Sequence, residues 1–88
     1  MKLHLELVAR KNDSSEEVLH SGLFLLKPGT QVTLGRSTRT RFSFGSDRVR
    51  KKIRKVYGNA KDAKDFDNIS RLQGYFFLDG EGKLRYRQ

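Results

Sequence analysis

The stretch Leu-Phe-Leu-Leu-Lys-Pro-Gly-Thr-Gln-Val-Thr-Leu-Gly-Arg, residues 23–36, decides the fold class. Its first apolar residues end a strand predicted over Val18–Lys27, and Thr30–Leu34 resumes an alternating β pattern. Between the two strands stand Pro28 and Gly29, whose backbone preferences suit the central positions of a type II turn. The stretch therefore predicts two strands joined by a tight turn.

The N-terminal side of this stretch carries the clearest strand signal. Leu3, Leu5 and Leu7 alternate with polar residues, so that one face of the strand is expected to pack on a core and the other to face water. The polar segment Lys11–Glu17 follows and is rich in residues that favour turns, so we predict a loop there.

The C-terminal side adds three short strands. Arg41–Phe44 alternates through its Phe residues, and Leu72–Leu78 and Lys83–Arg87 flank the Gly-containing turn Asp79–Gly82. The last two segments are predicted to form a hairpin that ends on an exposed edge strand. Because such an edge offers unpaired backbone groups, it also allows pairing with a second copy of the chain, and a homo-dimer is one expected assembly.

Residues 46–58 differ from the rest and are predicted to form a basic helical insertion. Ser46 is a good N-cap and Gly58 a C-terminal stop, and apolar residues recur between them at helical spacing, at Val49, Ile53 and Val56. The next segment, Asn59–Asn68, is rich in Lys and Asp and is compatible with another helical turn or with an irregular excursion.

Positive charge is concentrated in one segment of the chain. The formal net charge is +9, and Arg36–Lys55 holds nine basic residues against one acid, which leaves +8 in that segment. A field this concentrated favours a polyanionic partner, such as a phosphorylated protein, a nucleic acid or an acidic membrane. The basic residues of this segment are Arg36, Arg39, Arg41, Arg48, Arg50, Lys51, Lys52, Arg54 and Lys55.

Length and composition limit the function classes. The 88 residues are expected to form a single domain with a small core, and the absence of Cys excludes a disulfide framework and a thiolate zinc site. No apolar run approaches the about 18 residues of a membrane span, and the N-terminus lacks a signal-peptide pattern, so we expect an intracellular protein, cytoplasmic or nuclear. His4 and His20 lack metal-ligand spacing, and no nucleophile motif surrounds a Ser, so we predict no enzyme, no metal and no cofactor.

Two separated segments together resemble one known family. Residues 33–37, Thr-Leu-Gly-Arg-Ser, follow a predicted strand, and residues 68–71, Asn-Ile-Ser-Arg, precede another. This order of Gly-Arg, short strand and Ser-Arg segment is similar to that of the forkhead-associated (FHA) domain. The resemblance covers roughly residues 22–88. It implies a mainly β chain, an FHA-like β-sandwich with a basic helical insertion, whereas the helix alone also allows a small α+β domain.

The FHA resemblance implies a binding site for phosphothreonine-containing protein segments, in loops at one end of the sandwich. Arg36 and Ser70 would hold the phosphate, because a guanidinium offers a planar fork of donors and a loop hydroxyl adds a neutral donor. Neighbouring Ser37 and Arg71 belong to the same predicted phosphate-binding set. Two further residues are expected to set the loop geometry: Gly35 permits the turn that aims the arginine, and Gln73 stands where the family usually has a His.

The basic helix supports a second hypothesis from another class. A helix with its apolar side on the body of the protein would present its basic residues to a DNA or RNA backbone, with strongly salt-dependent affinity. The residues predicted for this alternative site are Arg48, Arg50, Lys51, Lys52, Arg54 and Lys55. A third interpretation leaves Gly35 and Arg36 as a hairpin corner and Ser70 as a turn or cap residue.

Overall fold

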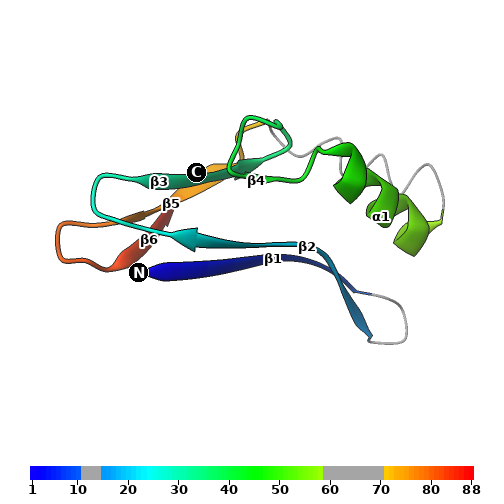
Figure 1. Ribbon diagram of the computed structural model, residues 1–88, viewed down its shortest axis with the longest axis horizontal. Helices are drawn as coiled ribbons and strands as arrows, with labels where there is room; N and C mark the ends of the chain where they lie inside the picture. Colours follow the sequence, from blue (N-terminus) through cyan, green and yellow to red (C-terminus); the bar gives the residue numbers. More distant parts are fainter. Residues whose placement is uncertain (11–14, 59–70) are drawn as a thin grey trace.

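The computed structural model describes residues 1–10, 15–58 and 71–88. Within these ranges it shows a mainly β small domain, with six strands in two sheets and one helix beyond one end of the larger sheet (Figure 1). The smaller sheet has two strands and lies against the larger one, which has four. The prediction of a mainly β chain is confirmed.

The smaller sheet is the antiparallel hairpin of β1 (Lys2–Arg10) and β2 (Glu16–Leu25). Its predicted alternation is confirmed, because Leu3, Leu5 and Leu7 turn toward the body while the residues between them are exposed. The predicted boundaries of the second strand were wrong by two residues at each end. Pairing with the end of β1, supported by an Arg10–Glu16 ion pair of 3.3 Å, carries β2 back to Glu16 into the predicted loop.

The larger sheet contains β3 (Gln31–Gly35), β4 (Phe42–Ser43), β5 (Gly74–Leu78) and β6 (Leu84–Arg87), in the order β4-β3-β5-β6. The short strand β4 runs parallel to β3, whereas β5 is antiparallel to both of its neighbours. The turn that leads into β3 is also confirmed. Gly29 has a φ of 81°, and the Thr30 N–H donates to the Lys27 carbonyl at 3.1 Å.

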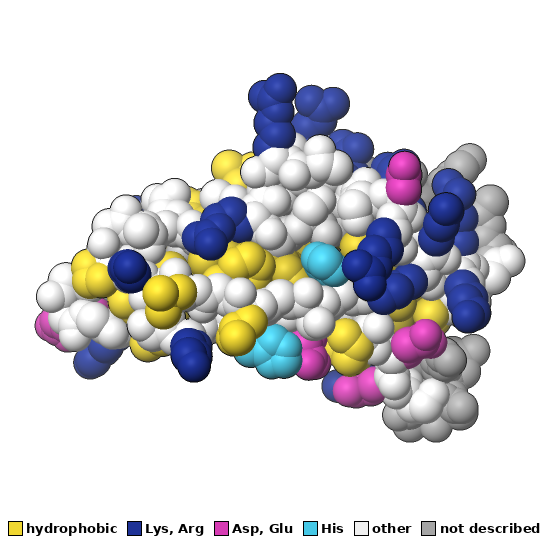
Figure 2. Space-filling model, viewed as in Figure 1, with side chains coloured by type: hydrophobic (Ala, Val, Ile, Leu, Met, Phe, Trp, Pro, Cys, Tyr) yellow, Lys and Arg dark blue, Asp and Glu magenta, His cyan; other side chains and the backbone are white. Residues whose placement is uncertain are grey.

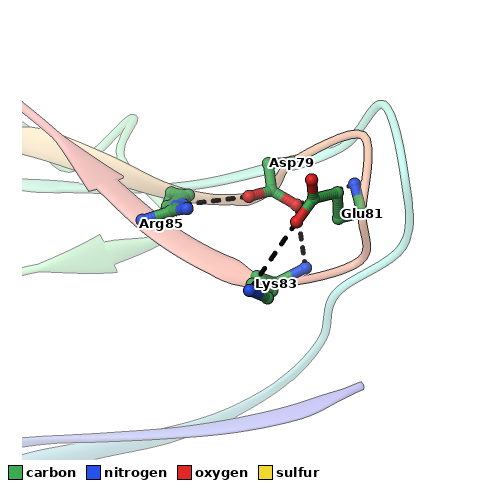
Figure 3. Close-up of polar contacts among 4 residues, drawn as sticks. All are labelled: Asp79, Glu81, Lys83 and Arg85. Carbon is green, nitrogen blue, oxygen red and sulfur yellow. Dashed lines mark hydrogen bonds and ion pairs between the residues drawn. The ribbon is translucent and has the colours of Figure 1, made fainter.

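The predicted hairpin of β5 and β6 is closed by one carboxylate. Asp79 Oδ1 accepts hydrogen bonds from the backbone N–H groups of Glu81 and Lys83, each at 2.9 Å. Its Oδ2 accepts from Arg85 Nε, also at 2.9 Å (Figure 3). Asp79 therefore fixes both the turn and the first half of the returning strand.

Two apolar clusters form the core. The first holds the two sheets together and consists of buried Leu3, Leu26 and Val32 with partly buried Leu5, Phe24, Phe76 and Leu78. The second fastens the helix to the hairpin and consists of buried Ala9, Leu19, Val49 and Ile53 with partly buried Leu7, Val56 and Tyr57. Because residues far apart in sequence supply each cluster, both depend on the complete arrangement of strands and helix.

The helix α1 (Asp47–Tyr57) forms where the capping pattern predicts it. At its start, Ser46 Oγ accepts a hydrogen bond from the Val49 N–H at 3.3 Å. At its end, Gly58 has a φ of 70° and donates its N–H to the Arg54 carbonyl at 2.8 Å. The helix lies beyond the end of β4, next to the far half of the β1–β2 hairpin (Figure 1). The neighbouring segment Asn59–Asn68, for which the sequence allows a helical turn or an irregular excursion, lies outside the described residues.

Candidate anion-binding site

The turn that follows β3 is braced by its own hydrogen bonds. The Gly35 carbonyl accepts from the Phe44 N–H at 2.8 Å, which holds the beginning and the end of the loop together. Within the loop, Thr40 Oγ1 donates to the Ser37 carbonyl at 2.6 Å, and Ser37 Oγ accepts from the Arg39 N–H at 3.2 Å. These bonds give the loop that carries Arg36 a defined backbone path.

A second set of bonds ties this loop to the segment that leads into β5. The Ser37 N–H donates to the Arg71 carbonyl at 3.1 Å, and the Gln73 N–H donates to the Leu34 carbonyl at 2.8 Å. The two segments that carry the FHA resemblance, 37 residues apart at Leu34 and Arg71, therefore meet at one end of the larger sheet. Ser70 lies outside the described residues, directly before Arg71 in the chain.

The predicted residues at this end differ in exposure. Arg71 is exposed, whereas Arg36, Ser37 and Gln73 are half-buried. The Gln73 carbonyl accepts a hydrogen bond from the Tyr86 hydroxyl at 3.4 Å, which links the entry of β5 to the edge strand. The backbone at this end is thus held by neighbouring strands, while one guanidinium reaches solvent.

The predicted basic surface of α1 is present. Buried Val49 and Ile53 fix the helix on the hairpin, and this leaves its polar side in water. Figure 2 shows Lys and Arg side chains gathered at the end of the molecule that holds α1 and along the edge above it. Of the six predicted residues, Arg50 is half-buried, and the exposed ones are Arg48, Lys51, Lys52, Arg54 and Lys55.

The basic helix and the Arg36 loop are neighbours in space. Gly45 lies so close to the Arg36 carbonyl that a Cβ atom on Gly45 would overlap with this oxygen. The helix cap follows at Ser46, and three Cα steps of 3.8 Å place Arg48 within about 11 Å of Gly45. The loop and the first turn of α1 are therefore neighbours, and both carry basic residues, Arg36 and Arg39 in the loop and Arg48 in the turn.

Not all of the concentrated positive charge belongs to this region. The Arg41 guanidinium lies over the Phe24 ring, 5.3 Å from its centroid, and its Nη1 donates to the Gln31 carbonyl at 3.5 Å. Its backbone N–H donates to Thr33 Oγ1 at 3.1 Å. Arg41 thus packs along the sheet, where it covers an aromatic ring.

The sequence did not predict where His20 lies relative to β4 and α1. Its ring stacks on Phe42 of β4, with centroids 4.9 Å apart and planes inclined by 22°. Burial lowers the pKa of His20, and the nearby positive charges of Lys52 and Arg48 lower it further. The alternation in β2 gives no signal for this position, because a bulge between β1 and β2 shifts the register beside His20.

Within the part of the chain that the structure describes, no helix has the length and apolar character needed to cross a membrane. Residues 1–10, 15–58 and 71–88 also contain no group of three or more His, Asp or Glu side chains arranged to hold a metal ion. The sequence matches no family model, and neither a curated protein nor a solved structure is significantly similar to it.

Proposed function

We propose that this protein is a non-enzymatic binding module that recognises phosphothreonine-containing protein segments, on a divergent FHA-like β-sandwich in which α1 is a basic insertion. One observation carries the proposal: the hydrogen bond from the Ser37 N–H to the Arg71 carbonyl. It brings together the Gly-Arg turn and the Ser-Arg segment, which the sequence separates by more than thirty residues.

The chemistry of this end of the sheet suits a phosphate group. Arg36 and Arg71 belong to the two joined segments, and a guanidinium binds two phosphate oxygens through parallel charge-assisted hydrogen bonds. Ser37 adds a hydroxyl donor from the first segment, and Ser70, which directly precedes Arg71 in the chain, is the second hydroxyl donor in this proposal. Gln73 occupies the entry of β5, where its backbone N–H is already bonded to β3 and helps to hold the segments in register.

The exposed basic residues of α1 would assist this recognition from outside the two joined segments. Positive charge beside the loop raises the encounter rate with a phosphorylated, acidic segment, and this effect weakens as salt is added. The phosphate contact itself gives specificity, because an unphosphorylated threonine offers the arginine no charge to bind.

The proposal is tested by titrating ¹⁵N-labelled protein with a phosphothreonine peptide and its unphosphorylated counterpart at near-physiological salt. We expect phosphate-dependent shifts centred on Arg36 and Arg71, and R36A should weaken binding by about tenfold or more, the effect of one lost charged hydrogen bond. K83A is the matched control, because Lys83 is exposed and lies beyond the opposite end of β5. Equal binding of both peptides, or equal losses in R36A and K83A, would refute the proposal.

A second candidate function rests on the five exposed basic residues of α1, which suit a nucleic-acid backbone. For single-stranded nucleic acid, the logarithm of the association constant falls linearly with the logarithm of the salt concentration. The slope is about −0.7 for each neutralised phosphate. Titration with a mixed-sequence oligonucleotide at several salt concentrations distinguishes the two functions. If the helix binds the nucleic-acid backbone, K51Q and K55Q should each make this salt dependence less steep. R36A should then weaken oligonucleotide binding no more than either of these variants.

A further inference from the structure

His20 lies near two basic residues, Arg48 and Lys52, where α1 packs against β2. Leu19 lies in the same buried cluster as Val49 and Ile53, which fixes the helix next to His20. Arg48 and Lys52 directly precede these two helix residues and are four positions apart, so they lie on one side of α1. Figure 2 shows a His side chain beside Lys and Arg side chains at this end of the molecule.

We propose that His20, Arg48 and Lys52 form a second phosphate site, which binds a second phosphate on the same protein segment that the Arg36 loop recognises. The identity of this ligand as a protein segment rests on the proposed function above. The site itself rests on the juxtaposition of the three side chains at the β2–α1 junction.

The surroundings of His20 favour an anion. Stacking on Phe42 fixes the imidazole ring, and among the described residues the charged groups that perturb it are Lys52 and Arg48, both positive. A phosphate bound between them would accept hydrogen bonds from all three side chains. It would offset the repulsion from Lys52 and Arg48, which adds to burial in lowering the pKa of His20. The bound anion is therefore expected to raise the pKa of His20, and binding is expected to strengthen as pH falls.

The second site lies near enough to the Arg36 loop for one extended segment to reach both. Phe42, which carries the His20 ring, pairs with Leu34 at the end of β3, one residue before the Gly-Arg turn. Arg48 is within about 11 Å of Gly45, which touches the Arg36 carbonyl. Extended chain advances about 3.3 Å per residue, so two phosphates three or four residues apart span about 10 to 13 Å.

The first test compares a singly phosphorylated threonine peptide with peptides that carry a second phosphate three or four residues away on either side. We expect one doubly phosphorylated peptide to bind about tenfold more tightly, and K52Q to remove this gain. K83Q removes the same charge from an exposed position beyond the opposite end of β5 and should keep most of the gain. No gain from any second phosphate, or equal losses in K52Q and K83Q, would overturn the proposal.

The second test uses inorganic phosphate against chloride at equal ionic strength and does not depend on the proposed function. We expect phosphate to shift the imidazole resonances of His20 and to raise its pKa, while the resonances of His4, on the outer face of β1, stay unchanged. Equal responses of the two histidines would overturn the site even if phosphothreonine peptides bind. If phosphate shifts His20 but phosphothreonine peptides do not bind, the anion site at His20 stands. The proposed function is then refuted, and so is the inference that one protein segment occupies both sites. A His20 response stronger with single-stranded DNA than with doubly phosphorylated peptides would overturn it in favour of a nucleic-acid backbone.

Discussion

Gly35 packs directly against the carbonyl oxygen of Arg71, with no room for a side chain between them. A Cβ atom on Gly35 would overlap with this oxygen and would also crowd the Gln73 nitrogen. The residue that ends β3 is therefore the point at which the two halves of the candidate site touch. Its glycine is explained by this close backbone approach and not by a left-handed turn, because the φ of Gly35 is not positive.

We expect G35A to separate the two segments and to weaken phosphothreonine-peptide binding together with stability. The added methyl group must displace backbone atoms, which cannot move aside as a flexible side chain can, so the cost is about 1 to 3 kcal/mol. Urea unfolding and the peptide titration measure the two effects. G80A is the control, because a Cβ atom on Gly80 would meet nothing within 4 Å. Similar behaviour of the two variants would contradict the close approach.

The strands were predictable where one face of the chain is buried. In β1 the residues Leu3, Leu5 and Leu7 alternate with polar ones, and the structure buries Leu3 and half-buries Leu5 and Leu7. In the apolar run at residues 23–26 this signal disappears, since all four residues are apolar. There Leu23 and Leu25 are 67% and 56% exposed, whereas Leu26 is fully buried. Only the pairing with β1 decides which side chains turn inward.

The candidate site was predictable only in part, because its two segments meet through backbone hydrogen bonds. Sequence order and the FHA resemblance indicated Arg36 and Arg71, and the structure places their segments together. The parallel pairing of β4 with β3 and the stacking of His20 on Phe42 join residues by tertiary contact. A local pattern cannot reveal such contacts, so the basic cluster at the β2–α1 junction emerged only from the structure.

Stability of the helix is expected to depend on Ile53, which is only 2% exposed in the cluster below α1. I53A leaves a cavity beneath a short helix and should lower the free energy of unfolding by about 2 to 4 kcal/mol. This is a large share of the about 5 to 15 kcal/mol that is typical for the unfolding of native proteins. Urea denaturation followed by circular dichroism measures it, with K51A as the exposed control on the same helix. Equal midpoints would show that α1 is not packed as described.

The N-terminus of α1 offers a separate test of local structure. S46A removes the acceptor of the Val49 N–H and should cost about 1 kcal/mol, whereas S46D supplies another acceptor and should keep most of the stability. Thermal unfolding compares the variants, with S21A as control at an exposed strand position. If S46A and S46D lose stability equally, capping is not the cause. Because α1 carries Arg48 and Lys52, S46A is also expected to weaken phosphate-dependent shifts at His20.

Asp79 makes the stability of the β5–β6 hairpin depend on pH. The backbone N–H of Lys83, the Arg85 side chain and the backbone N–H of Glu81 hold the pKa of Asp79 below its ordinary value of 3.8. A carboxyl group with a lowered folded-state pKa stabilises the fold above its unfolded pKa, and this contribution is lost as pH falls through the folded pKa. D79N should therefore unfold at a lower temperature than the native protein at neutral pH, and the difference should shrink below pH 3.8 and vanish in stronger acid. Thermal midpoints across this range, with E81Q in the same turn as control, measure the effect. A difference that persists unchanged in strong acid would assign it to the shape of the side chain rather than to its charge.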